Sequence, residues 1–173
     1  LGVCTVVLAS SIWINPVAKG VPEITKSETM QQIRDLVKED PQAIWLVVDM
    51  AYPATNIPAM AGADCLNTTQ TYPQKTRWEM LDPEGEYEDI YNRYCHIRAS
   101  LGSKTMLELV STDYVEVTLS PEDLKKLNIR YIVSTNDFDE KIAAGTTNIF
   151  TDSGIEFQKY YEGAQLSIYG CVY

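Results

Sequence analysis

The sequence has one histidine and a shortage of basic residues. Fourteen Lys and Arg stand against twenty-four Asp and Glu, which gives a net charge of −10. Nucleic-acid binding needs clustered basic side chains, and anionic lipid headgroups repel an acidic surface, so we expect neither as a partner. Any Ser-His or Cys-His catalytic pair would depend on His96. Its neighbour Cys95 is a poor partner, because adjacent residues of a strand point to opposite faces.

Several motifs that mark common functions are also missing. The chain has no G-x-G-x-x-G or Walker A sequence for phosphate binding, and no G-x-S-x-G nucleophile elbow. The four cysteines include no C-x-x-C pair, so we predict no metal site and no cofactor. The acidic residues offer many carboxylate pairs of the kind that hydrolyse glycosides, but nothing in the sequence selects one pair.

The N-terminal segment is uncharged. No apolar run reaches the roughly 20 residues of a membrane-spanning helix, but the chain opens with LGVCTVVLASSIWI. This segment lacks the basic start of a signal peptide. Two interpretations stay open for residues 1–10: the end of a transmembrane helix, or a buried first strand. We expect residues 11–173 to form a single α/β domain, with a strand around residues 12–14.

The spacing of apolar residues predicts an α/β fold. Ser27 is placed to cap a helix that carries Met30, Ile33 and Val37 at helical spacing. The continuous apolar run 43–48 is typical of a strand covered on both faces. We expect one domain with a mixed β-sheet of about six strands, flanking helices and a C-terminal β-hairpin. The other predicted strands are 94–99, 105–110, 114–119, 129–134, 155–161 and 165–171, and a further helix begins at Ser120-Pro121.

Aromatic and hydrogen-bonding side chains are most closely mixed in residues 66–97. We call residues 66–97 the excursion, because they are predicted to form a loop-rich segment beside the sheet. Binding sites usually lie in such segments. Arg93 can hold a carboxylate with its five donors, and we expect Asp82 to be its partner. The alternative is that these side chains only pin the excursion to the core. The predicted ligand-binding cluster consists of Trp78, Asp82, Asn92, Arg93 and His96.

The tyrosines of the same stretch allow two interpretations. Tyr87, Tyr91 and Tyr94 share one face of a predicted helix and are most simply core residues. If the domain binds a sugar, Tyr72, Trp78 and Tyr91 would instead serve as stacking platforms.

Asp49, a cysteine pair and one asparagine are further candidates for function or modification. Asp49 follows an apolar strand, and ligands of open α/β sheets bind outside the carboxyl ends of strands; a loop acid or helix cap is the alternative. Cys65 and Cys95 bracket the excursion and are the predicted disulfide if the protein is exported, although buried free thiols are equally compatible. Asn67-Thr68-Thr69 matches the acceptor pattern for N-glycosylation, which also arises by chance.

A series of segments, in chain order, carries a family resemblance. The pattern L-x-x-L-N-I-R-Y-I-V-S followed by a closing Y-x-x-x-x-x-L-S-I-Y hairpin is its most specific part. The chain resembles the extracytoplasmic C-terminal domain of bacterial multipass membrane proteins of the glycosyltransferase C superfamily. The segments are INPVAKG, WLVVDM, TYPQKTRWEMLDP, YNRYCHI, LKKLNIRYIVS and IEFQKYYEGAQLSIYG.

The resemblance implies a location and a role. It places the domain at the cell membrane, on the extracytoplasmic face, with its own transmembrane region and a glycan or lipid-linked sugar as partners. The catalytic carboxylate of such proteins lies on a loop among the membrane helices, so no catalytic residue is carried over to this chain. We therefore expect a domain that is not catalytic by itself, in a parent protein of cell-envelope polysaccharide or lipid-linked sugar metabolism. The alternative is a free-standing carbohydrate- or ligand-binding module.

Overall fold

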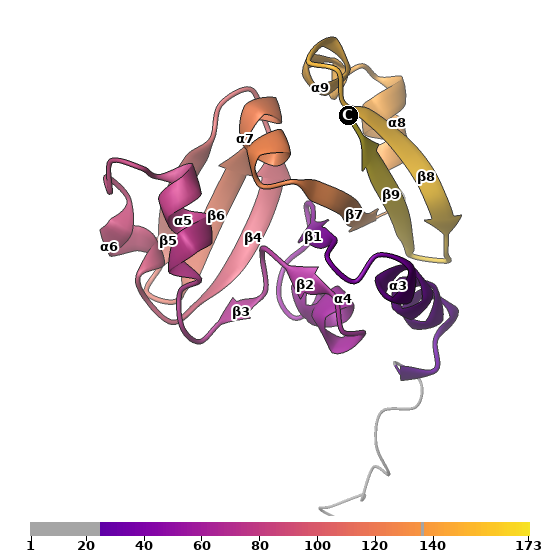
Figure 1. Cartoon of the computed structure of the whole chain (residues 1–173), viewed down its shortest axis with the longest axis horizontal. Helices are drawn as coiled ribbons and strands as arrows, with labels where there is room; N and C mark the ends of the chain where they lie inside the picture. The colour runs from indigo at the N-terminus through magenta and orange to yellow at the C-terminus, as the bar shows by residue number, and fades with distance from the viewer. Residues whose placement is uncertain (1–24, 136) are drawn as a thin grey trace, which may run out of the picture.

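The computed structural model describes residues 25–135 and 137–173, which fold into two β-sheets with helices packed against them (Figure 1). The interpretations of residues 1–10 and of a strand near residue 12 fall outside the described residues, as does Cys4. None of the helices within the described ranges is both long enough and apolar enough to cross a membrane.

One sheet contains five strands. β1 pairs in parallel with β2 and β7, and β9 pairs antiparallel with β7 and β8. The C-terminal hairpin predicted from the sequence is formed by β8 and β9. In the order β2-β1-β7-β9-β8, the strands are β2 (Asp64–Cys65), β1 (Ile44–Val47), β7 (Ile129–Thr135), β9 (Leu166–Val172) and β8 (Glu156–Glu162).

The other sheet contains four strands. β4 pairs in parallel with β6 and antiparallel with β3, and β5 pairs antiparallel with β6. In the order β3-β4-β6-β5, the strands are β3 (Thr69–Gln70), β4 (Cys95–Leu101), β6 (Tyr114–Leu119) and β5 (Met106–Ser111).

The α/β class is confirmed, and the strands divide between two sheets where the sequence predicted one. Among the described residues, one parallel bridge between Val48 and Ala99 joins the backbones of the two sheets. There Val48 N–H donates to Val133 O of one sheet at 2.8 Å, and Asp49 N–H donates to Ala99 O of the other at 2.9 Å. Alternating apolar residues indicate which face of a strand is buried, but they do not specify its neighbour. The division into two sheets was therefore not predictable from the pattern.

Short helices fill the space around the sheets. Ser27 caps α3 as predicted, since its Oγ accepts from Met30 N–H at 3.3 Å. Ser120 caps α7 in the same way, by accepting from Asp123 N–H at 3.2 Å. The described helices are α3 (Glu28–Glu39), the 3₁₀ turn η1 (Ala54–Asn56), α4 (Ile57–Met60), α5 (Lys75–Leu81), α6 (Glu88–Tyr91), α7 (Pro121–Lys126), α8 (Asp137–Ala143) and α9 (Asn148–Asp152).

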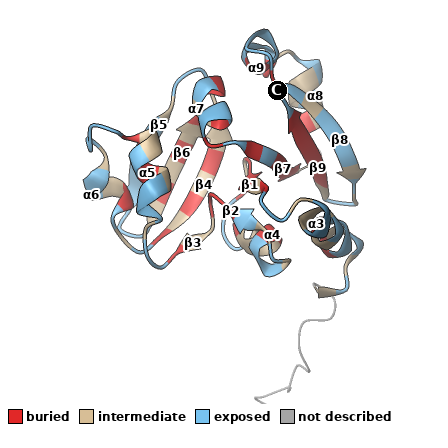
Figure 2. Ribbon diagram, viewed as in Figure 1, coloured by how far each residue is buried: buried red, intermediate tan, exposed pale blue. Residues whose placement is uncertain are grey.

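The core has two clusters, one on each side of β1. Trp45 and Val47 pack with Ile33 of α3, whereas Leu46 and Val48 belong to the larger cluster. Both faces of β1 are thus covered, which explains why its sequence is apolar throughout. Figure 2 shows the same burial along most of β9.

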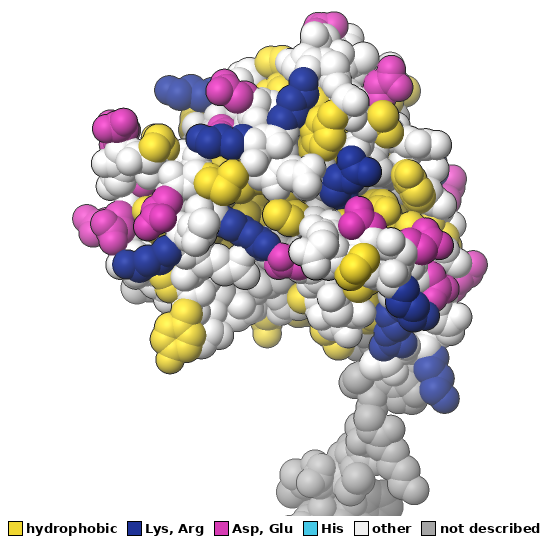
Figure 3. All heavy atoms as spheres, viewed as in Figure 1, with side chains coloured by type: hydrophobic (Ala, Val, Ile, Leu, Met, Phe, Trp, Pro, Cys, Tyr) yellow, Lys and Arg dark blue, Asp and Glu magenta, His cyan; other side chains and the backbone are white. Residues whose placement is uncertain are grey.

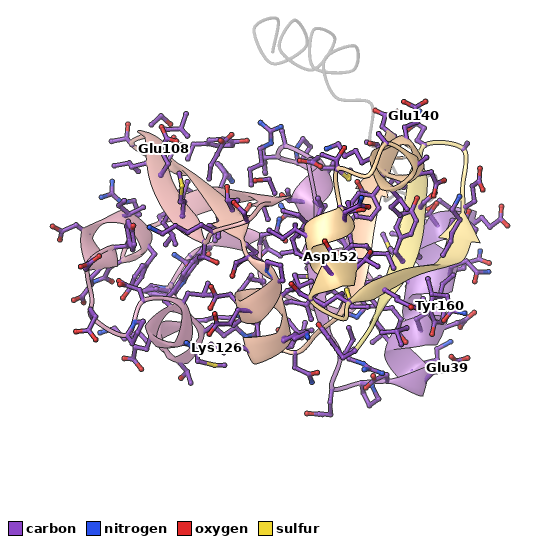
Figure 4. All side chains as sticks on the ribbon, turned by 90° about the horizontal axis from the view of Figure 1, so that it is seen from above. Glu39, Glu108, Lys126, Glu140, Asp152 and Tyr160 are labelled. Carbon is purple, nitrogen blue, oxygen red and sulfur yellow. The ribbon has the colours of Figure 1, made fainter. Side chains whose placement is uncertain are left out.

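The four-stranded sheet is covered by helices on one face. Trp78 of α5, Tyr91 of α6 and Leu124 of α7 join the larger core cluster together with Ile97 of β4 and Val117 of β6. Figures 1 and 4 both place these three helices on the same side of the sheet. The opposite side carries the alternate residues of β4 and β6.

Candidate functional site

A buried hydrogen-bond network centred on Gln70 organises the excursion. Its Oε1 accepts from Trp78 Nε1 at 2.7 Å, and its Nε2 donates to Tyr91 O at 2.7 Å and Arg93 O at 3.0 Å. The Trp78 and Tyr91 rings stack with centroids 5.1 Å apart and planes 8° from parallel. Trp78 is 2% exposed and Tyr91 5%, so neither can serve as a stacking platform for a ligand. This part of the predicted cluster pins the excursion to the core.

The predicted ion pair between Asp82 and Arg93 is wrong. Asp82 is 5% exposed, and its carboxylate accepts from the backbone N–H of Glu86 at 2.9 Å and of Tyr87 at 2.8 Å. Arg93 donates to the carbonyl oxygens of Asp89 and Thr112. A turn right after Asp82 offers two backbone donors close in sequence, and they satisfy the carboxylate without a charged partner.

Asn92 and Asp49 lie outside this network. Asn92 is exposed, and its amide is 3.5 Å from the Glu88 carboxylate. Asp49 adopts a left-handed backbone conformation, with φ of 59°, and forms an ion pair with Lys141 of α8. Neither shares a hydrogen bond or ion pair with Trp78. Asp49 therefore ties the end of β1 to α8, as the loop-acid alternative implies.

His96 belongs to a separate aromatic group at the surface. Its ring lies against that of Tyr52 at 4.1 Å between centroids, and against the edge of Tyr94 at 5.5 Å. Tyr52 is 52% exposed and Tyr94 51%. The hydroxyls of both tyrosines have no hydrogen-bond partner among the described residues, so they are available to a ligand. Tyr52, Tyr94 and His96 are called the aromatic end below.

Hydrogen bonds fix the orientation of the His96 ring. Thr69 Oγ1 is 3.1 Å from Nδ1 of His96 and accepts from Asn56 Nδ2 at 3.0 Å. Because that hydroxyl accepts from Asn56, its own proton is free to be donated to Nδ1. A neutral ring then carries its proton on Nε2, where no described residue is a partner. Asn56 Oδ1 in turn accepts from Thr69 N–H at 2.9 Å.

The aromatic end continues into a row of polar pairs across β4 and β6. The register sets His96 beside Tyr114, and an ion pair of 3.1 Å joins Arg98 and Glu116. These side chains are half-buried, because they stand on the side of the sheet that the helices leave uncovered. The open face, as it is called below, consists of His96, Arg98 and Ser100 of β4 with Tyr114, Glu116 and Thr118 of β6.

The sequence contains a signal for this face, which lies outside the predicted cluster except for His96. Cys95, Ile97 and Ala99 alternate with the polar residues of β4, and a strand of period two must present those polar residues together. Tyr52 and Asn56 carried no such signal, because they lie in the turn before η1 and at the end of η1, which only the folded chain brings to His96.

Two further hollows adjoin polar groups that already form hydrogen bonds within the protein. The larger, of about 440 Å³, lies at the start of α7, where Asp123 accepts from Ser120 Oγ at 3.0 Å and from the Thr105 hydroxyl. The smaller, of about 220 Å³, adjoins Gln70 and Trp78. These contacts cap a helix and hold the excursion, so neither hollow is the preferred site.

The charged surface favours no anionic partner. On the face drawn in Figure 3, Lys and Arg side chains are scattered among acidic and neutral ones and form no single basic patch. Within residues 25–135 and 137–173, no three His, Cys, Asp or Glu side chains come together as a metal-ligand set.

The predicted disulfide is not formed. Cys65 and Cys95 are free thiols that belong to different core clusters and to different sheets. Sequence separation alone suggested the pair, but β2 and β4 carry the two side chains into separate apolar environments. Burial raises the pKa of the Cys65 thiol to about 12 and that of the Cys95 thiol to about 11.

We expect stability to fall at alkaline pH because of these thiols. Burial also raises the pKa of Cys171 to about 12. In the unfolded chain a thiol ionises near the reference pKa of 9.0, so the stabilising contribution is complete below pH 9 and is lost as the pH rises towards the folded pKa values. The midpoint of urea unfolding should therefore decrease steadily above pH 9. A midpoint that stays constant through pH 11 would contradict this reading.

Asn67 has a structural role in place of the glycosylation suggested by its sequence context. Its side chain is fully buried; Oδ1 accepts from Val47 N–H at 2.8 Å, and Nδ2 donates to Val47 O at 2.7 Å. The amide thus pairs with β1 as a neighbouring strand would. The folded chain cannot present this nitrogen to a modifying enzyme.

Comparison with known proteins identifies a family. Residues 23–173 match a family described as "Domain of unknown function (DUF7654)". Searches of curated proteins and of solved structures gave no match. The matched range includes every described helix and strand, and with them the Gln70 network and the open face. This chain therefore belongs to the DUF7654 family.

Proposed function

We propose that this domain is the extracytoplasmic, glycan-binding part of a membrane-embedded glycosyltransferase-like protein. It is not catalytic by itself, and it holds a polysaccharide or lipid-linked sugar near the membrane site of its parent protein. The glycan part of the proposal is supported by the aromatic end. The membrane part is supported by the resemblance of the sequence segments to the glycosyltransferase C superfamily.

The observation that carries glycan binding is a pair of half-exposed tyrosines around an oriented histidine. A sugar ring has an apolar C–H face that packs on an aromatic ring, and hydroxyls at its rim that need donors and acceptors. Tyr52 offers the ring surface, and the free tyrosine hydroxyls with Nε2 of His96 offer hydrogen bonds. The ring of His96 is already held by Thr69, which lowers the entropy cost of binding.

We expect Tyr52→Ala to weaken glycan binding about tenfold, since removing a central aromatic contact costs on the order of 1.4 kcal/mol. Binding is measured on a glycan array and then by calorimetry with the glycans retained. Tyr160→Ala is the matched control, because Tyr160 is 50% exposed but lies on β8 of the five-stranded sheet. Figure 4 shows Tyr160 at the opposite end of the molecule from Glu108 of β5. Equal losses in the two variants, or a chain that binds no glycan, would refute the proposal.

The free-standing module remains the second candidate, favoured by a site that lies wholly within this domain. Membrane fractionation of the native, full-length protein separates the two. Retention in the membrane fraction after a salt wash supports the first candidate, and recovery in the soluble fraction supports the second. Under both candidate functions, the isolated chain should not turn over nucleotide sugars or lipid-linked sugars.

A further inference from the structure

We infer that the open face binds an uncharged oligosaccharide, laid along β4 and β6 from the aromatic end. This inference rests on the proposed function and adds the class of glycan that the site takes. Three observations carry it: the length of the face, the order of its side chains and its charge.

The length of the face suits a chain of sugars. β4 and β6 run parallel, and their paired residues succeed one another from His96 beside Tyr114 to Ser100 beside Thr118. Ser100 is four positions after His96, which amounts to about 13 Å along a parallel strand. One pyranose ring on Tyr52 would leave most of this row without a partner. A short oligosaccharide would reach from the aromatic end to the last pair.

The side chains of the successive pairs offer hydrogen-bond donors and acceptors along that row. After the aromatic end comes the ion pair of Arg98 with Glu116, whose side chains are 41% and 39% exposed. The hydroxyls of Ser100 and Thr118 follow, 3.1 Å apart. Each pair keeps donors and acceptors beyond its mutual bond, because a guanidinium has five donors and a carboxylate about four acceptor positions. Sugar hydroxyls, which both donate and accept, can bind such pairs without breaking them.

The charge of the face excludes an acidic glycan. In the register between β5 and β6, Glu108 stands directly opposite Glu116. Figure 4 labels Glu108 on the side of the sheet away from Lys126 of α7, which is the uncovered side. Across the order β4-β6-β5, Arg98, Glu116 and Glu108 stand side by side, so two carboxylates and one guanidinium leave one excess negative charge in the middle of the row. The whole chain carries −10. A uronic acid laid there would meet like charge, which disfavours binding.

The test compares glycans of different length and charge on the folded chain. The probes are uncharged gluco-, manno- and galacto-oligosaccharides from monosaccharide to hexasaccharide, with oligogalacturonates of the same lengths. We expect the affinity for an uncharged trisaccharide to exceed that for its monosaccharide at least about tenfold. Replacing both hydroxyls at the far end, in Ser100→Ala/Thr118→Ala, should reduce this ratio towards one. Ser111→Ala/Thr112→Ala, at the last residue of β5 and the first of the turn that follows it, is the control at the near end of the face and should leave the ratio unchanged.

The outcomes distinguish failure of the inference alone from failure of the proposed function. A monosaccharide that binds as tightly as the longer chains, or oligogalacturonates that bind as well as uncharged chains, would overturn the inference and leave glycan binding in place. Binding of no probe, neutral or acidic, would overturn both. In Glu108→Gln/Glu116→Gln we expect the affinity for oligogalacturonates, relative to that for uncharged chains, to rise at least about tenfold. An unchanged relative affinity would show that these carboxylates do not exclude acidic glycans.

Discussion

Asn67→Ala should lower the free energy of unfolding by about 3–5 kcal/mol, the largest effect we expect from a single polar side chain here. The side chain bonds both backbone groups of Val47, and it is fully buried. Alanine would leave an N–H and a C=O of β1 without partners in the core, and each buried unpaired group costs about 1–3 kcal/mol. Urea unfolding monitored by circular dichroism measures the loss.

Two variants keep this prediction specific. Asn92→Ala removes the same amide from an exposed position and should change stability by less than about 0.5 kcal/mol. Asn67→Asp retains an acceptor for Val47 N–H but offers no donor to Val47 O until the carboxyl is protonated. Burial raises the folded pKa of such a carboxyl, so its stability should be higher at low pH and fall as the pH rises. A loss below about 1 kcal/mol in Asn67→Ala would show that water replaces the amide.

Trp78→Ala, as a single substitution, should lower the free energy of unfolding by about 3–5 kcal/mol, because it removes a large buried ring from the core. The ring stacks on Tyr91, and its N–H donates to Gln70. Loss of the ring therefore opens a cavity and also leaves the Gln70 acceptor unpaired in a buried position. Thermal or urea unfolding of the variant checks the value, and a cost close to that of an exposed substitution would contradict the packing described above.

Trp78→Phe separates packing from hydrogen bonding. It keeps an aromatic ring against Tyr91 but removes the donor to Gln70, so we expect a loss of about 1–3 kcal/mol. Gln70→Met in the same background removes the unpaired acceptor as well. A double-mutant cycle of the two changes should give a coupling energy of about 0.5–3 kcal/mol. Additive effects would show that the bond between Trp78 and Gln70 contributes nothing measurable.

These variants also connect the buried network to the surface site. Gln70 and Thr69 are neighbours on β3, with Gln70 facing the core and Thr69 bonded to His96. The network that pins the excursion thus fixes the strand that orients the histidine ring. We expect Trp78→Phe to preserve glycan binding in the folded fraction, because the backbone of β3 stays in place.

Local chemistry was enough to predict the longer strands and the capped helices of this protein, but not the two-residue strands β2 and β3. Ser27 and Ser120 cap their helices as predicted, since a cap needs only a hydroxyl and the N–H three residues later. The apolar run of β1 indicated a strand buried on both faces, and alternation indicated the C-terminal hairpin. Composition alone also argued against a basic binding surface.

The tertiary structure alone decided which of these elements and side chains meet. Asp82 took nearby backbone donors in place of Arg93, and the amide of Asn67 paired with β1, twenty residues away. The two cysteines were carried into separate cores. Tyr52 reached His96 from a loop with no periodic signal. Such pairings depend on where the whole chain satisfies buried donors and acceptors at lowest cost, and spacing along the sequence does not contain that information.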